Sequence, residues 1–230
     1  MDDTLLDTSG RLEESWTIVC DDAARALDCE APFLREIFRR EFEEFWRDEA
    51  AVEHWRVRLN EARVHVVTLA LQRAGLDTSV AQRISDGLEH DRKGRQELFH
   101  DAIETLEWLR DRGFRLALIT NGPAAMQRDK LARFPLEQYF DTVVIEGVFG
   151  AGKPDPRVFQ HALEVTGAKP HEAWHVGDNL YADIGGAQKA GVHGVWIHRD
   201  RLELRDDHPT RPDRVIAHLH ELREALGPPG

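Results

Sequence analysis

The chain has 230 residues, and its 30 Lys and Arg against 42 Asp and Glu give a formal net charge of −12. This length suits one compact domain, or a core of roughly 150 residues with an inserted subdomain. The acidic balance disfavours a nucleic-acid partner, because neutralising a phosphate backbone needs clustered cations. Small phosphorylated metabolites remain possible substrates, since a bound metal ion can reverse the local field.

The cysteines and the hydropathy pattern disfavour two further classes of protein. Cys20 and Cys29 are the only cysteines, and neither lies at metal-ligand spacing from a His or the other Cys. We therefore expect no zinc site and interpret both as buried, reduced thiols. No apolar run approaches the roughly 18 residues that span a bilayer, and no signal segment precedes the first acidic residues. The expected location is cytoplasmic, with no membrane partner.

Residues 9–95 have a helical hydrophobic period. Apolar residues recur at three- and four-residue spacing, Pro32 suits a helix first turn, and Gly75 suits a helix end. The pattern predicts four helices, over about 12–27, 32–46, 52–70 and 80–88. No segment between Ser9 and Leu98 is predicted to be a strand.

The period changes after the polar run that ends near residue 95, and helical and short apolar segments then alternate as in βαβ units. This alternation predicts a parallel α/β core formed by residues 1–8 and 96–230, with 9–95 as a helical insert. The predicted strands cover 114–119, 142–145, 173–176 and 194–197, with a short apolar piece at 214–217. The helices between them cover about 103–109, 124–134, 156–166 and 184–190, and a last one runs through 226.

Polar residues lie where two of these segments end. In an open parallel sheet, ligands bind beyond the carboxyl ends of the strands. Thr120 and Asn121 follow an apolar strand and offer a hydroxyl and an amide to phosphoryl oxygens, although Thr-Asn-Gly is also a good turn. Lys153 lies in a loop that Pro154 keeps extended, where it could neutralise a bound anion or simply be solvated.

A third strand end carries carboxylates. Asp178 follows Gly177 at the end of a strand, and Asp183 follows five positions later. Mg²⁺ is typically held by one or two carboxylates, with water and substrate oxygens completing the octahedron. The alternative is an acidic helix cap stabilised by the macrodipole. His175, on the strand itself, is interpreted as structural.

Taken together and in order, these segments resemble the haloacid dehalogenase-like hydrolase superfamily. The matching segments are Asp-Asp-Thr-Leu-Leu at the start, Ile-Thr-Asn-Gly, Gly-Lys-Pro-Asp-Pro, and His-Val-Gly-Asp-Asn followed by Ala-Asp-Ile-Gly-Gly-Ala. The resemblance covers nearly the whole chain. It implies a Rossmann-like parallel sheet whose central strand ends in an Asp-x-Asp-x-Thr loop, with an inserted α-helical cap.

The resemblance also implies roles for individual residues. The first Asp of that loop attacks phosphorus to form an aspartyl-phosphate, and the second is general acid and base. Here the second Asp is Asp2, which would also give its backbone carbonyl to Mg²⁺, and the loop threonine is Thr4. The remaining roles are phosphate binding by Thr120, Asn121 and Lys153, Mg²⁺ ligation by Asp178, and orientation of the lysine or a metal-bound water by Asp183.

The register of the first motif departs from the family. Counting back two residues from Asp2 places the nucleophile immediately before Met1, together with the strand that should precede it. Either an upstream segment carries both, which we expect, or the chain is a relative without a nucleophile. A missing central strand would expose the edges of its neighbours.

The sequence therefore predicts a Mg²⁺-dependent phosphomonoesterase acting on a small phosphorylated metabolite, with its nucleophile upstream of Met1. The alternative from another class is a catalytically inactive binding or regulatory protein. A 2-haloacid dehalogenase is disfavoured by Asp2, because attack on carbon needs no second acid to protonate an alkoxide. A phosphomutase is a further alternative.

Overall fold

The computed structural model describes residues 1–8, 12–47, 54–199 and 208–227. The chain divides into two compact units, residues 1–7 with 97–230, and residues 8–96. Among the described residues, no helix is long and apolar enough to cross a bilayer.

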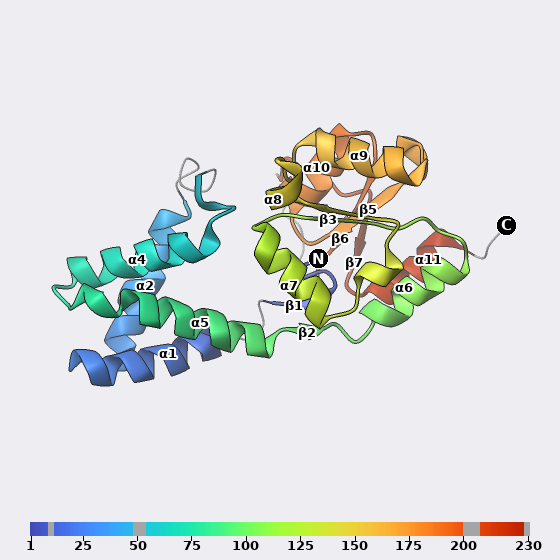
Figure 1. Cartoon of the computed structure of the whole chain (residues 1–230). Helices are drawn as coiled ribbons and strands as arrows, with labels where there is room; N and C mark the ends of the chain where they lie inside the picture. The colour runs from blue at the N-terminus through green and yellow to red at the C-terminus, as the bar shows by residue number, and fades with distance from the viewer. Residues whose placement is uncertain (9–11, 48–53, 200–207, 228–230) are drawn as a thin grey trace. The chain divides into compact units, whose positions relative to one another are not determined.

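The unit of residues 8–96 is built from helices (Figure 1). They are α1 (Leu12–Leu27), α2 (Ala31–Phe45), α4 (Leu59–Arg73), a 3₁₀ turn η1 (Thr78–Val80) and α5 (Ala81–Arg95). Their apolar stripes meet in one core, whose largest fully buried members include Leu34, Phe38 and Leu71. The predicted third helix is interrupted: residues 54 and 55 are helical, a turn follows at 56 and 57, and α4 begins at Leu59. Its predicted start at Val52 lies outside the described residues.

Two sequence predictions for this region are wrong. Glu97 and Leu98 form a short strand, β2, which pairs antiparallel with β1 (Leu6–Asp7) through the pair Leu6 and Leu98. Two residues are too short to show a period, so the pattern could not identify this strand. Cys20 is buried, but Cys29 is only partly buried, because it follows the end of α1; both thiols are free.

The second unit has a mixed α/β fold with strands between layers of helices (Figure 1). Its remaining strands are β3 (Ala117–Thr120), β4 (Thr142–Ile145), β5 (Trp174–Gly177), β6 (His193–Ile197) and β7 (Arg214–Ile216). The helices are α6 (Ala102–Asp111), α7 (Ala124–Arg133), α8 (Glu146–Phe149), α9 (Pro156–Thr166), α10 (Gly186–Lys189) and α11 (Leu222–Leu226). Short helical turns are η2 (Glu137–Tyr139), η3 (Pro170–Glu172), the π-helical η4 (Leu180–Gly185) and η5 (Leu219–Glu221).

The parallel strands fall into two groups. β3 pairs with β4, and β5 pairs with β6, which pairs with β7, all in parallel register. Among the described residues, no strand joins β3 to β5. The predicted strand from Phe114 is shorter than expected and begins at Ala117.

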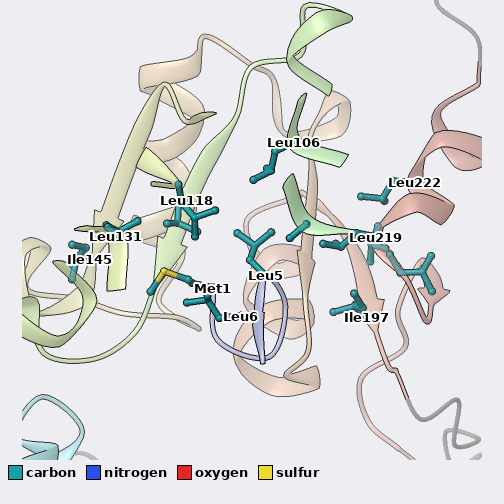
Figure 2. Close-up of a cluster of buried hydrophobic side chains, with 14 residues drawn as sticks. Met1, Leu5, Leu6, Leu106, Leu118, Leu131, Ile145, Ile197, Leu219 and Leu222 are labelled. Carbon is teal, nitrogen blue, oxygen red and sulfur yellow. The ribbon is translucent and has the colours of Figure 1, made fainter. Parts of the chain in front are cut away.

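One apolar core connects the two strand groups. Figure 2 shows Met1, Leu5 and Leu6 between Leu118 from β3 on one side and Ile197 from β6 on the other. The first residues of the chain are therefore packed into the core, with Met1 6% and Leu6 0% exposed.

Candidate active site

The polar residues predicted from the sequence come together at the carboxyl ends of β3 and β5. Asn121 follows β3, Asp178 follows β5, and Lys153 and Thr4 reach the same place from loops. Three pairs of residues are in contact here: Thr4 with Asp178, Lys153 with Asp183, and Asn121 with Lys153. Because strand ends meet at one edge of an α/β sheet, residues far apart in sequence form one site.

A tight loop formed by residues 1–6 presents Thr4. The backbone N–H groups of Leu5 and Leu6 both donate to the Met1 carbonyl, at 2.9 and 3.1 Å. Asp3 adopts the left-handed conformation, φ 51°, that short polar side chains tolerate. The Thr4 hydroxyl donates to Asp178 Oδ1 at 3.2 Å, so the loop contacts the end of β5.

Arg199 also contacts this loop. Its Nη2 donates to the Thr4 carbonyl at 2.8 Å and lies 3.6 Å from Asp101 Oδ1. The guanidinium lies 3.4 Å from the centroid of the Phe99 ring. The sequence reasoning missed this residue, since an arginine far from every motif carries no local signal.

Lys153 and Asp183 form a buried ion pair. Lys153 Nζ lies 2.6 Å from Asp183 Oδ1, with side chains 9% and 5% exposed. His175 Nε2 lies 3.0 Å from the same oxygen, and the Asn179 N–H donates to Oδ2 at 3.0 Å. Burial alone would raise the pKa of Asp183, but Lys153 and His175 outweigh it and hold the pKa far below its ordinary value. Burial lowers the pKa of His175.

The loop carrying Lys153 is held by Asn121. The Asn121 amide donates to the Lys153 carbonyl at 2.8 Å, and the Lys153 N–H donates to Asn121 Oδ1 at 2.7 Å. Gln127 Nε2 in turn donates to the Asn121 carbonyl at 2.8 Å. One amide proton of Asn121 is thus used to position the lysine, and Thr120 beside it is 3% exposed.

Asp178 carries a charge that its surroundings disfavour. Burial is the larger cause and the charge of Asp183 the next, and together they raise the pKa of the Asp178 carboxyl. The Trp196 indole N–H donates to the Asp178 carbonyl at 2.8 Å, which fixes the backbone at the end of β5. A carboxylate in this environment fits a hard divalent cation, which would offset the repulsion.

Asp2 has a partner that the sequence did not predict. Lys130 Nζ lies 2.6 Å from Asp2 Oδ2, and the Lys130 side chain is only 8% exposed. Burial raises the pKa of Asp2, but Lys130 and the Met1 ammonium outweigh it and lower the pKa below its usual range. A lysine on the amphipathic helix α7 looks like any solvated helix lysine in the sequence.

A cavity of about 500 Å³ lies beside this site and runs between β3 and β5. Its lining includes Leu118 and Ile119 of β3, His175 and Val176 of β5, and Met1.

A second group of potential ligands, His100, Asp101 and His218, lies elsewhere in this unit. The buried Asp101 already accepts a hydrogen bond from the Leu219 N–H at 2.6 Å and lies near the Arg199 guanidinium. Protein groups therefore balance its charge, and we assign this group no function.

Comparison with known proteins places this chain in one class of hydrolase. The family described as haloacid dehalogenase-like hydrolase matches residues 1–191. The chain belongs to this family, which confirms the resemblance inferred from its motifs.

Individual relatives differ in the reaction that their names describe. A phosphoserine phosphatase from Thermus thermophilus is 41% identical over 167 residues, covering 71% of this chain and 66% of that protein. A crystal structure of a haloacid dehalogenase-like phosphatase from Thermococcus onnurineus is 30% identical, with a TM-score of 0.70 and coverage of 99% and 95% of the two chains. A 2-haloacid dehalogenase from Pseudomonas syringae is 31% identical, with a TM-score of 0.64 and coverage of 98% and 95%.

The chain spans 66%, 56% and 52% of the lengths of the first three curated relatives that it matches. The names of these relatives therefore do not by themselves assign an activity to this chain.

Proposed function

We propose that the protein is a Mg²⁺-dependent phosphomonoesterase that cleaves a small phosphorylated metabolite through an aspartyl-phosphate. The nucleophilic aspartate immediately precedes Met1, on a strand that enters the core beside β3 and β5. The observation that carries the proposal is the buried Lys153 and Asp183 ion pair, set beside the Thr4 and Asp178 contact at the ends of the strands.

The first part of the proposal concerns the cation. Asp178 and the Asp2 carbonyl would hold Mg²⁺, which supplies positive charge to neutralise phosphoryl oxygens when it is bound. Thr4 orients the Asp178 carboxylate by its hydrogen bond of 3.2 Å. The raised pKa of Asp178 supports this assignment, because a nearby cation would stabilise the charged form.

The second part concerns the phosphoryl group. Lys153 supplies a positive charge whose position is fixed by Asp183 and by the Asn121 hydrogen bonds. Thr120 and Asn121 bind phosphoryl oxygens at the end of β3. Preorganised donors of this kind stabilise charge that develops in the transition state without reorganising at the moment of reaction.

The third part concerns proton transfer. Asp2 protonates the leaving oxygen and then takes a proton from the attacking water. In the present chain the Met1 ammonium is one of the charges that lower the pKa of Asp2. A residue joined before Met1 replaces this ammonium with a neutral amide, so the pKa of Asp2 rises toward the range that an acid needs.

We assign residues 8–96 the role of a helical cap that selects the leaving group and excludes water from the site. Similarity to a phosphatase and to a dehalogenase leaves both reactions to be tested. Asp2 favours phosphate chemistry, because an alkoxide leaving group requires protonation and a halide does not. A binding or regulatory protein is the alternative for a chain without a nucleophile.

Phosphate release from p-nitrophenyl phosphate tests the proposal. Residues 1–230 alone should release little phosphate, whereas the chain extended upstream by an apolar strand and Asp should turn over with Mg²⁺ and stop when Mg²⁺ is chelated. Asp178→Asn in the extended chain should abolish Mg²⁺-dependent turnover. Robust turnover by residues 1–230, abolished by Asp2→Asn, would contradict the register.

A further inference from the structure

We infer that Trp196 and Arg199, at and just beyond the carboxyl end of β6, are positioning residues for the proposed cation ligand Asp178. Trp196 fixes the backbone of Asp178, and Arg199 fixes its carboxylate through Thr4. We assign neither side chain a contact with the cation or with the substrate. The inference rests on the proposed function, because Asp178 is the proposed Mg²⁺ ligand, and it adds two residues that set the affinity for that cation.

The backbone contact is made by the Trp196 indole. The ladder between β5 and β6 ends with the pair Gly177 and Trp196, and Asp178 follows one residue beyond it. The buried indole donates its N–H to the Asp178 carbonyl at 2.8 Å. The His198 ring stacks on the indole, with ring centroids 4.4 Å apart and planes at 13°. Because the stack fixes the plane of this donor, the hydrogen bond holds the Asp178 backbone in one orientation.

The carboxylate contact runs through the first loop of the chain. Arg199 Nη2 donates to the Thr4 carbonyl at 2.8 Å, and the Thr4 hydroxyl donates to Asp178 Oδ1 at 3.2 Å. The guanidinium is itself held 3.4 Å from the centroid of the Phe99 ring and 3.6 Å from Asp101 Oδ1. A planar guanidinium that is stacked and paired in this way has little freedom. Arg199 therefore acts on the Asp178 carboxylate by fixing Thr4.

A ligand held at both its backbone and its carboxylate favours cation binding. Mg²⁺ demands near-ideal octahedral geometry, so a ligand that is already oriented costs less ordering when the cation binds. Replacing the partners that orient metal ligands typically lowers metal affinity or activity by about 10–100-fold. Asp178 has such a partner on its carbonyl, from Trp196, and another on its carboxylate, from Thr4.

The charge of Arg199 separates positioning from simple electrostatics. A positive charge near a cation site repels the cation, so its removal should strengthen cation binding by charge alone. Loss of a positioning contact has the opposite sign, because Thr4 and then Asp178 gain freedom. Weaker Mg²⁺ binding by Arg199→Met is therefore not explained by the lost charge. Trp196→Phe changes no charge and keeps an aromatic ring beside His198 while removing the N–H donor.

Calorimetric titration with Mg²⁺ tests the inference in the chain extended upstream by a strand and Asp. We expect Trp196→Phe and Arg199→Met each to weaken Mg²⁺ binding by about tenfold. Arg199→Lys keeps a donor for the Thr4 carbonyl and should weaken it less. Trp174→Phe is the matched control, because Trp174 begins β5 while Asp178 follows its end, and it should leave the affinity unchanged. Urea unfolding checks that each variant is folded during the titration.

Phosphate release from p-nitrophenyl phosphate supplies a second measurement. The Mg²⁺ concentration for half-maximal release should rise about tenfold in Trp196→Phe and in Arg199→Met, with release at saturating Mg²⁺ within about twofold of the parent chain. A merely structural role predicts the reverse pattern. Less active protein would then be present at every Mg²⁺ concentration, and the half-maximal concentration would not change.

The outcomes separate this inference from the proposed function. Unchanged or tighter Mg²⁺ binding by both variants, in a parent chain that binds Mg²⁺ and releases phosphate, overturns the positioning role alone. Weakening by one variant only overturns the role of the other residue. Weaker Mg²⁺ binding by both variants, in a parent chain that releases no phosphate, supports the positioning role and contradicts the proposed function. A parent chain that binds no Mg²⁺ contradicts both.

Discussion

Lys153 Nζ and His175 Nε2 converge on one oxygen, Asp183 Oδ1, at 2.6 and 3.0 Å. The carboxylate is thus fixed between a residue of the proposed phosphate-binding loop and a residue of β5. A buried charge with two hydrogen-bonding partners holds one geometry, because breaking either contact leaves charge unsolvated. Asp183 therefore sets where the Lys153 ammonium lies.

The contributions of Lys153 and Asp183 to the free energy of unfolding should depend strongly on one another. Asp183→Asn removes the charge that balances buried Lys153, and we expect a loss of about 3–5 kcal/mol. Lys153→Met should also destabilise, but the double variant should lose less than the two single losses together. Urea unfolding of the four proteins measures this coupling. Additive losses would show that the two charges do not depend on one another.

Stability should fall in acid because of Asp183. Its folded pKa lies far below the ordinary value near 3.9, so the unfolded chain binds the proton first as the pH falls. The contribution is fully present above about pH 5 and is lost progressively below the unfolded pKa. Asp183→Asn should flatten the dependence of the urea midpoint on pH below about 5. An unchanged slope in the variant would contradict the depressed pKa.

Gly177 should tolerate no side chain. A Cβ at this position would overlap the Asp183 carboxylate, so Gly177→Ala forces the carboxylate away from Lys153. We expect a loss of about 1–3 kcal/mol or more from overpacking, with a larger loss of phosphate release in the extended chain. Gly185→Ala is the matched control, because its nearest neighbour lies at 3.5 Å. Equal effects of the two substitutions would count against this explanation.

The two thiols should react at different rates. Cys20 is fully buried in the helical unit, and burial raises its pKa to about 12. Cys29 is partly accessible, so it should react first with a thiol reagent in the folded protein. Mass spectrometry of the labelled peptides measures the ratio, and unfolding should abolish the difference. Fast labelling of Cys20 in the native state would show that the core of this unit opens readily.

The sequence predicted much of this fold because its motifs and periods are local. The strand over 142–145 and the helix over 156–166 have the predicted bounds. The resemblance implied that Asp183 orients Lys153, but the sequence did not predict the contact of Thr4 with Asp178. Lys130 and Arg199 could not be predicted, because their contacts with Asp2 and Thr4 join residues 128 and 195 positions apart.

The cavity also depends on tertiary structure. The register of the first motif predicted a strand before Met1, but it could not predict that residues of β3, β5, α6 and α9 line one cavity.

The most direct test of the account is to locate the phosphoryl group on the protein. The chain extended upstream by a strand and Asp is mixed with substrate and Mg²⁺, quenched in acid within a turnover, digested and analysed by mass spectrometry. We expect one phosphoryl adduct, on the peptide that contains the aspartate before Met1. The adduct should disappear when that aspartate is replaced by Asn. An adduct on another residue, or undiminished turnover by the Asn variant, would contradict it.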